Sequence, residues 1–144
     1  MGPRAGALLV LGMALAFAGG CAELMRGPAL PPRGMAYYHW EAIARNDVGM
    51  ATISYSPNAT LEWVGGPLQG KYTGPAAIAE VWTKFFIAQG PSEVDVSNVQ
   101  ERPEAGKQTV TARVIFKGRR TVPVDYMLIF EGDQIVAETW RVRP

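Results

Sequence analysis

The stretch QTVTARVIFKGRRTVPVDYMLIFEGDQIVAETWRV, residues 108–142, decides the fold. Apolar and polar residues alternate along most of it, which is the period of β-strands with one buried face. Gly118 and the pair Gly132-Asp133 interrupt the alternation where tight hairpin turns are expected. The pattern predicts antiparallel strands at residues 108–117, 121–131 and 134–142, and a further strand at residues 93–101.

A helix is predicted immediately before these strands, in residues 75–90. Its apolar side chains recur at the three- and four-residue spacing of a buried helix face, at Ile78, Val81, Trp82, Phe85 and Phe86. Pro75 suits the first turn of a helix, and Gly90-Pro91 ends it.

The segment before that helix predicts smaller elements. A helix is expected at residues 35–45, a short helix at 48–55 capped by Asp47, a turn at 56–58, a strand at 60–64 and a loop at 65–74. Helices followed by an antiparallel meander predict one α+β domain over residues 35–144.

Residues 1–20 are predicted to be a signal peptide. Arg4 precedes an apolar run, residues 7–18, that is too short to span a bilayer as a helix. The sequence Ala18-Gly19-Gly20-Cys21 then resembles a lipobox, and Cys21 is the only cysteine of the chain. The alternative is an ordinary secreted protein cleaved after Ala16-Phe17-Ala18.

The lipobox resemblance implies that Cys21 carries a diacylglycerol and an N-terminal acyl chain such as palmitate, so that the membrane is a partner. Residues 21–34 are expected to be the lipidated cysteine and a flexible tether, because three prolines and two glycines interrupt them. The expected location is the cell envelope, facing the periplasm, at the outer membrane if the host is Gram-negative. The alternative location is the periplasm, without an anchor.

The composition argues against several classes of function. One histidine and one cysteine exclude a metal site rich in either residue, and no disulfide can form within one chain. The 14 basic and 13 acidic residues nearly balance and form no basic tract, which argues against a nucleic-acid partner. No cofactor and no metal are predicted.

Three short segments resemble the nuclear transport factor 2-like (SnoaL-like) superfamily: residues 47–50, 58–63 and 72–78, which read DVGM, NATLEW and YTGPAAI. The resemblance extends over residues 35–142. It implies a cone, in which a strongly curved sheet wraps the helices and encloses an apolar pocket. The superfamily includes isomerases, cyclases, dehydratases and non-catalytic binders, so the resemblance does not choose a function.

Hairpin pairing predicts which side chains point into this cone. Two-residue turns place Ala112 opposite Asp125, and Asp125 opposite Trp140. The concave face is then mostly apolar and carries Val110, Ala112, Val114, Phe116, Asp125, Met127, Ile129, Val136, Glu138 and Trp140. The apolar members of this face and Trp63 are predicted to line the pocket. The other face, with Val122, Val124, Tyr126, Leu128 and Phe130, is also partly apolar and predicts a homodimer through the sheet.

The segment Arg119–Tyr126 resembles the ketosteroid isomerase strand that carries a protonated oxyanion-hole aspartate. The resemblance implies that Asp125 is a neutral hydrogen-bond donor, assisted by Tyr38 or His39 on the first helix. The general base of that family falls on Trp63, which cannot accept a proton. Glu138 is the alternative base, in a proton-sharing pair with Asp125. Otherwise Glu138 lies exposed at the mouth, or pairs with Arg113 or Arg141.

These residues leave three functions open. The first is a non-catalytic, membrane-anchored domain whose apolar pocket binds a small hydrophobic ligand or a protein partner. The second is a cofactor-independent isomerase, dehydratase or cyclase that uses Asp125 and Glu138. The third is a structural or assembly factor of the envelope that uses the outer sheet face. A cone completely filled by Trp63 and its neighbours would exclude a small ligand and favour a protein partner.

Overall fold

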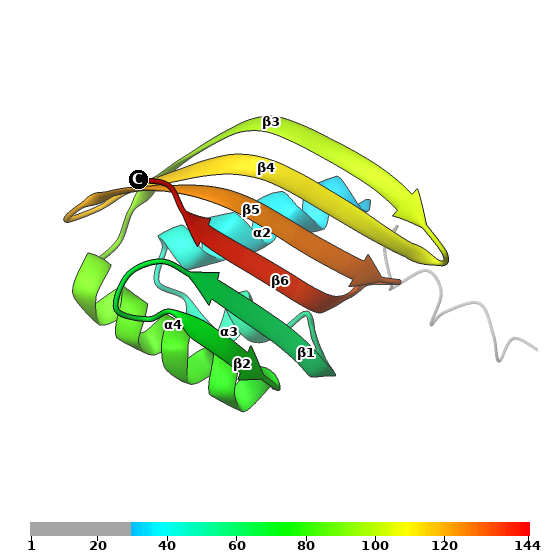
Figure 1. Ribbon diagram of the computed structural model, residues 1–144, viewed down its shortest axis with the longest axis horizontal. Helices are drawn as coiled ribbons and strands as arrows, with labels where there is room; N and C mark the ends of the chain where they lie inside the picture. Colours follow the sequence, from blue (N-terminus) through cyan, green and yellow to red (C-terminus); the bar gives the residue numbers. More distant parts are fainter. Residues whose placement is uncertain (1–29) are drawn as a thin grey trace, which may run out of the picture.

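The computed structural model describes residues 30–144, so the predicted signal peptide, Cys21 and most of the predicted tether lie outside the described residues. The helices are α2 (Pro32–Ala44), α3 (Val48–Thr52) and α4 (Pro75–Gln89). The strands are β1 (Tyr55–Val64), β2 (Gly70–Thr73), β3 (Glu93–Glu104), β4 (Lys107–Lys117), β5 (Thr121–Glu131) and β6 (Gln134–Val142). The predicted α+β fold, with helices before an antiparallel meander, is confirmed (Figure 1).

All six strands belong to one curved sheet in the order β2-β1-β6-β5-β4-β3. Strands β3 to β6 form the antiparallel meander, and β1 joins it by pairing parallel to β6. Figure 1 shows the sheet bent over the helices, with α2 behind the meander and α4 beside β1 and β2. This arrangement is the expected cone.

Several boundaries differ from the sequence prediction for local reasons. Helix α2 begins at Pro32, three residues earlier than expected, because a proline is compatible with the first turn of a helix. The predicted turn at residues 56–58 is extended and belongs to β1. Its pairing with β6 is irregular between Tyr55 and Thr60, where Pro57 lies, so the proline interrupts no regular ladder.

The predicted register of β5 is wrong by one residue on both sides. The β4–β5 connection pairs Lys117 with Thr121 and therefore has three loop residues rather than two. On the other side, β6 has an extra residue, Val136, at an irregularity between Ile129 and Phe130. Because side chains alternate in a strand, one residue of shift moves every β5 side chain to the opposite face.

The two faces of β5 are consequently exchanged. Asp125, Met127 and Ile129, predicted for the concave face, share the outer face with their β4 partners Arg113, Thr111 and Thr109. Val124, Tyr126, Leu128 and Phe130 are buried in the cone instead. The residues on which the homodimer prediction rested are therefore inside the cone, and the apolar residues of the outer face of β5 are Pro123, Met127 and Ile129 instead.

Large aromatic side chains fill the concave side of the sheet. The largest fully buried side chains are Trp40, Trp82, Trp140, Phe116 and Phe130. The predicted inward positions of Val110, Ala112, Val114 and Phe116 on β4 are confirmed by their burial. Helix α4 buries the stripe that its spacing predicted.

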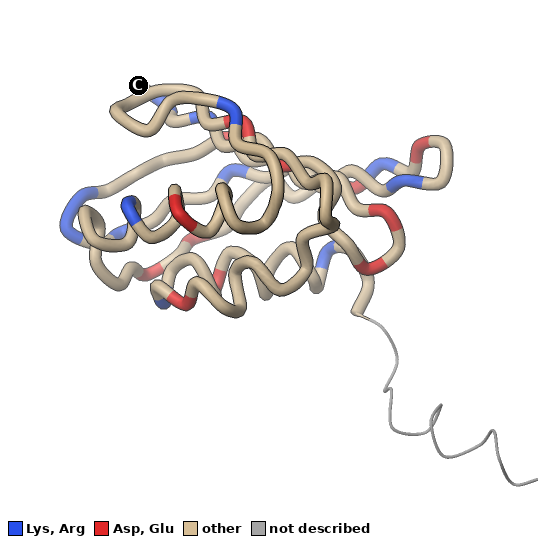
Figure 2. The backbone as a smooth tube through the Cα atoms, turned by 90° about the horizontal axis from the view of Figure 1, so that it is seen from below, with Lys and Arg blue, Asp and Glu red and all other residues tan. Residues whose placement is uncertain are grey.

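Charged residues are spread along the described chain without a large cluster of one sign (Figure 2). Within residues 30–144, no helix has the length and apolar character needed to cross a bilayer.

Candidate functional site

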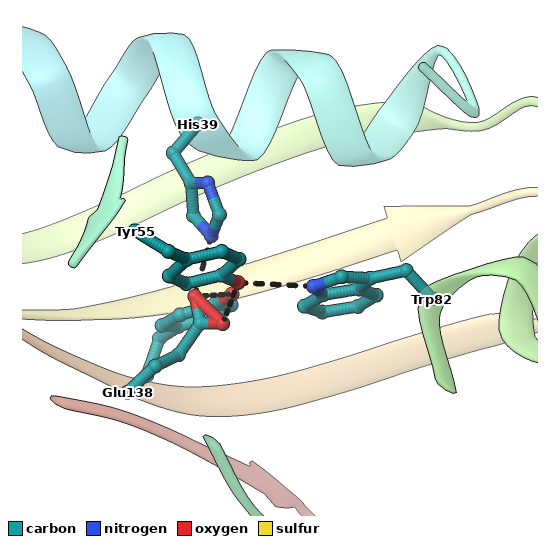
Figure 3. A network of polar contacts seen from close by, with 5 residues as sticks. His39, Tyr55, Trp82 and Glu138 are labelled. Carbon is teal, nitrogen blue, oxygen red and sulfur yellow. Dashed lines mark hydrogen bonds and ion pairs between the residues drawn. The ribbon is translucent and has the colours of Figure 1, made fainter. Parts of the chain in front are cut away.

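Glu138 lies at the centre of a buried polar cluster inside the cone. It is on β6, faces inward as predicted, and is 1% exposed. Its Oε1 accepts a hydrogen bond from the Tyr55 hydroxyl at 2.6 Å, and its Oε2 accepts one from the Tyr126 hydroxyl at 2.8 Å. His39 Nε2 also bonds to Oε2 (Figure 3). The predictions that Glu138 is exposed at the mouth or pairs with Arg113 or Arg141 are therefore wrong.

The first helix supplies His39 to this cluster. Helix α2 buries one face, which carries Ala36, Trp40 and Ile43 beside His39, and His39 itself is 3% exposed. The neighbouring Tyr38 points away from the cone and is 53% exposed, because successive helix residues lie on different faces. Of the two predicted assistants on this helix, only His39 reaches the site.

Two tyrosines and a tryptophan complete the cluster, and the sequence analysis missed their roles. Tyr55 begins β1, and its hydroxyl accepts a hydrogen bond from Trp82 Nε1 of α4 at 3.0 Å. Tyr126 lies on β5 opposite Trp140. Had the sequence analysis assumed a three-residue β4–β5 loop, it would have placed Tyr126 inside the cone. Tyr55 was assigned to the predicted helix at residues 48–55, and no feature of the sequence indicated its role.

The electrostatics of the cluster keep both phenols protonated. Burial raises the pKa of Tyr55 well above its ordinary value, and the nearby carboxyl group of Glu138 raises it further. The pKa of Tyr126 is raised by the same two causes, with burial again the larger. Each phenol therefore acts as a hydrogen-bond donor to the Glu138 carboxylate, which offers only acceptor sites when ionised.

Aromatic rings surround this polar centre. Trp63 stacks on Trp140 with ring centroids 4.6 Å apart, and Trp140 stacks on Phe116 at 5.1 Å. The ring of Trp63 also approaches Trp82 at 5.5 Å and Phe85 at 5.4 Å. These contacts fill the space in which the sequence predicted a pocket, so Trp63 and Trp140 act as core residues.

Three hollows of the surface lie outside the cone, and of the polar cluster only Tyr126 borders one of them. One of about 400 Å³ lies on the outer sheet face and is lined in part by Thr111, Met127 and Thr139. A second lies at the β3–β4 turn and a third at the β5–β6 turn. His39, Tyr55 and Glu138 line none of these three hollows.

Asp125 is separate from Glu138, and the predicted proton-sharing pair is wrong. Its carboxylate is on the outer face of β5, with its side chain half exposed, and forms an ion pair with Arg143 Nε at 3.3 Å. Met127 and Ile129 share this face, so they do not line the cone either. Val136, also predicted for the concave face, is the extra residue at the β6 irregularity and lines the hollow at the β5–β6 turn. Within residues 30–144, no three histidine, cysteine or acidic side chains are placed to hold a metal ion.

The chain belongs to the SnoaL-like domain family, whose pattern matches residues 36–138. The cone itself is shared with solved structures of low sequence identity. One is a nuclear transport factor 2-like protein of unknown function from Pseudomonas putida KT2440, with 12% identity, a TM-score of 0.65 and coverage of 76% of this chain and 82% of that chain.

Two further solved structures have names that suggest enzymes. One, described as a putative scytalone dehydratase from Novosphingobium aromaticivorans, is 11% identical with a TM-score of 0.62, covering 76% of this chain and 80% of that chain. The other, described as a putative polyketide cyclase from Sinorhizobium meliloti, is 18% identical with a TM-score of 0.53. The match covers 78% of this chain and 95% of that chain. A search among proteins of curated function gave no match. Identities this low show a common fold and nothing about the reaction.

Proposed function

We propose that this protein is a non-catalytic SnoaL-like domain, tethered to the bacterial envelope through Cys21, that binds a protein partner with its outer surface. The observation that carries the proposal is the burial of the acid–base cluster formed by His39 and Glu138 in the cone. His39 is 3% exposed and Glu138 is 1% exposed. A substrate has no route to either side chain while the aromatic rings are in place.

The hydrogen bonds of the cluster support the same conclusion. The Glu138 carboxylate is bonded to His39, Tyr55 and Tyr126, so a substrate would have to displace an internal partner. A connected buried network of this kind stabilises one arrangement of a core. Moving Trp63 out of its stack would leave a cavity, and truncations that leave aromatic cavities cost about 3–5 kcal/mol. The cone is therefore better suited to holding the fold together than to admitting a ligand.

The anchor is tested by metabolic labelling with a palmitate analogue, followed by separation of membranes. We expect the full chain to incorporate the label and to sediment with membranes, because the lipobox resemblance predicts an acylated cysteine at residue 21. Cys21→Ser is the matched variant and should lose the label. Label retained by Cys21→Ser would contradict acylation at residue 21, whereas a soluble, unlabelled wild-type protein would leave the secreted alternative.

The partner is tested by photo-crosslinking in cells that produce the protein natively. A crosslinking residue is placed at Met127, in the outer-face hollow, and at Ile87, which is 72% exposed on α4. We expect a discrete adduct from position 127 and none from position 87. An adduct of twice the chain mass identifies a second copy, whereas no adduct from the sheet face contradicts the proposal.

An acid–base enzyme is the second candidate, and one observation favours it. A histidine, a carboxylate and two tyrosines converge inside the cone, which are the residue types used for proton transfer. This function requires Trp63 or Trp82 to move and expose Glu138. Hydrogen exchange of the Trp82 indole N–H, which bonds to Tyr55, measures that opening. Exchange through local opening would favour the enzyme, whereas exchange only through global unfolding would exclude it.

A further inference from the structure

Three arginines surround one aspartate on the outer face of the sheet. In the strand register, Asp125 on β5 lies between Arg113 of β4 and Arg141 of β6. Cross-strand partners share a face of a sheet, so Arg113, Asp125 and Arg141 form a row on the outer face. The ion pair of Asp125, however, is with Arg143 at 3.3 Å.

The row and Arg143 together therefore carry positive charge that is not neutralised locally. Asp125 balances one of the three guanidinium groups, and within the described part of the chain Arg113 and Arg141 make no ion pair. The Nε of Arg113 is buried and has no hydrogen-bond partner. Buried polar groups nearly always have a partner, so this guanidinium N–H is available to an acceptor.

Arg113, Asp125 and Arg141 border the 400 Å³ hollow of the outer face, whereas Arg143 does not. Arg113 and Arg141 line it together with four uncharged polar residues: Asn98, Gln100, Thr111 and Thr139. Asn98 lies where the β3–β4 register shifts, and its φ of 54° is in the left-handed region. This irregularity allows Asn98 and Gln100 both to border the hollow, and such bulges are common beside binding sites.

We propose that this hollow binds an oxyanion, either a carboxylate or a phosphate group, through Arg113 and Arg141. A guanidinium presents paired N–H donors that match the two oxygens of such a group, and charge-assisted bonds of this kind are strong. The amides of Asn98 and Gln100 and the two threonine hydroxyls supply further donors. The site lies on the same outer face as the proposed partner surface and deepens that proposal, but it is independent of the cone, which is on the opposite side of the sheet.

The test is calorimetric titration of the full chain in a mild detergent with inorganic phosphate and, separately, with succinate, at constant ionic strength. We expect saturable binding of at least one anion, and the tighter arm identifies the source as a phosphate or a carboxylate. Arg113→Gln and Arg141→Gln should each weaken binding about tenfold, because each removes a charge-assisted contact. Asp125→Asn should tighten it, because it removes the repelling carboxylate.

Arg45→Gln is the matched control, since it removes the same charge from the far end of α2, where Arg45 pairs with Glu41 on the surface. This variant should bind as the wild type does. Far-UV circular dichroism confirms that each variant is folded. Lack of saturation by both anions, or an equal loss in Arg45→Gln, would overturn the proposal.

Discussion

Trp63 and Trp140 are direct partners in the parallel pairing of β1 with β6, and their indole rings stack with centroids 4.6 Å apart and planes 25° apart. Trp63 is the position at which the ketosteroid isomerase resemblance would place a general base. In this chain the position is occupied by a stacked tryptophan, which is part of the core. The consequence is a cone whose interior is closed.

Replacing Trp63 with alanine should therefore damage the fold. The change removes the stack on Trp140 and leaves a cavity, so we expect the free energy of unfolding to fall by about 3–5 kcal/mol. Urea denaturation measures this loss, and near-ultraviolet circular dichroism should lose the signal of the coupled indoles. Trp63→Phe keeps an aromatic ring and should lose less. An unchanged stability in Trp63→Ala would mean that Trp63 is a movable lid and would favour the enzyme.

Replacing Glu138 should reveal a structural network. Glu138→Ala leaves the side chains of His39, Tyr55 and Tyr126 without their shared partner in the core, and each buried donor left without an acceptor costs about 1–3 kcal/mol. Glu138→Gln keeps one acceptor oxygen and should cost less. Both values come from urea denaturation, with the exposed Glu131→Gln as the unaffected control. A fully stable Glu138→Ala would show that the network contributes nothing to the fold.

The two buried tyrosines predict a loss of stability in alkali. Their pKa values in the folded protein are raised above the value of about 10 expected for the unfolded chain. The unfolded state therefore loses protons first, so the stabilisation is complete below pH 10 and declines as the pH rises above it. Each tyrosine contributes a slope of up to about 1.4 kcal/mol per pH unit.

The measurement is the free energy of unfolding between about pH 9 and 12, a window around the ordinary tyrosine pKa. Tyr126→Phe and Tyr55→Phe should each reduce the slope, whereas Tyr38→Phe, on the exposed side of α2, should not. Equal slopes in all four proteins would contradict the assignment of the two phenols.

Gly118 should tolerate no side chain. A Cβ atom at this position would lie 2.7 Å from the carbonyl oxygen of Gln89 and 2.7 Å from Ser92 Oγ. The β4–β5 loop packs there against the end of α4, where Arg119 N donates to the Gln89 carbonyl oxygen at 2.9 Å. Overpacking of this kind costs about 1–3 kcal/mol, so the melting temperature of Gly118→Ala should fall.

The matched control for that loop is Gly49→Ala in α3. Its Cβ would meet only Asp47 Oδ1 at an ordinary 3.5 Å, and alanine favours a helix more than glycine does. Gly49→Ala should therefore keep or raise the melting temperature. A loss as large as that of Gly118→Ala would contradict the packing argument.

The sequence by itself determined the order and type of the main elements. The period of two predicted the bounds of β5 and β6, and the helical spacing predicted α4 and its buried face, because these patterns are local. The inward position of Glu138 and the family resemblance also followed from the sequence, and the structure and the family match confirm them.

Only the tertiary structure decided which acids meet. One additional loop residue after Lys117 and one extra residue in β6 exchange the faces of β5, which sends Asp125 outward and brings Tyr126 to Glu138. Alternation alone could not detect the exchange, because both faces of β5 carry apolar residues. The contacts among His39, Tyr55, Trp82 and Glu138 join α2, β1, α4 and β6, and they exist only once the sheet has closed over the helices.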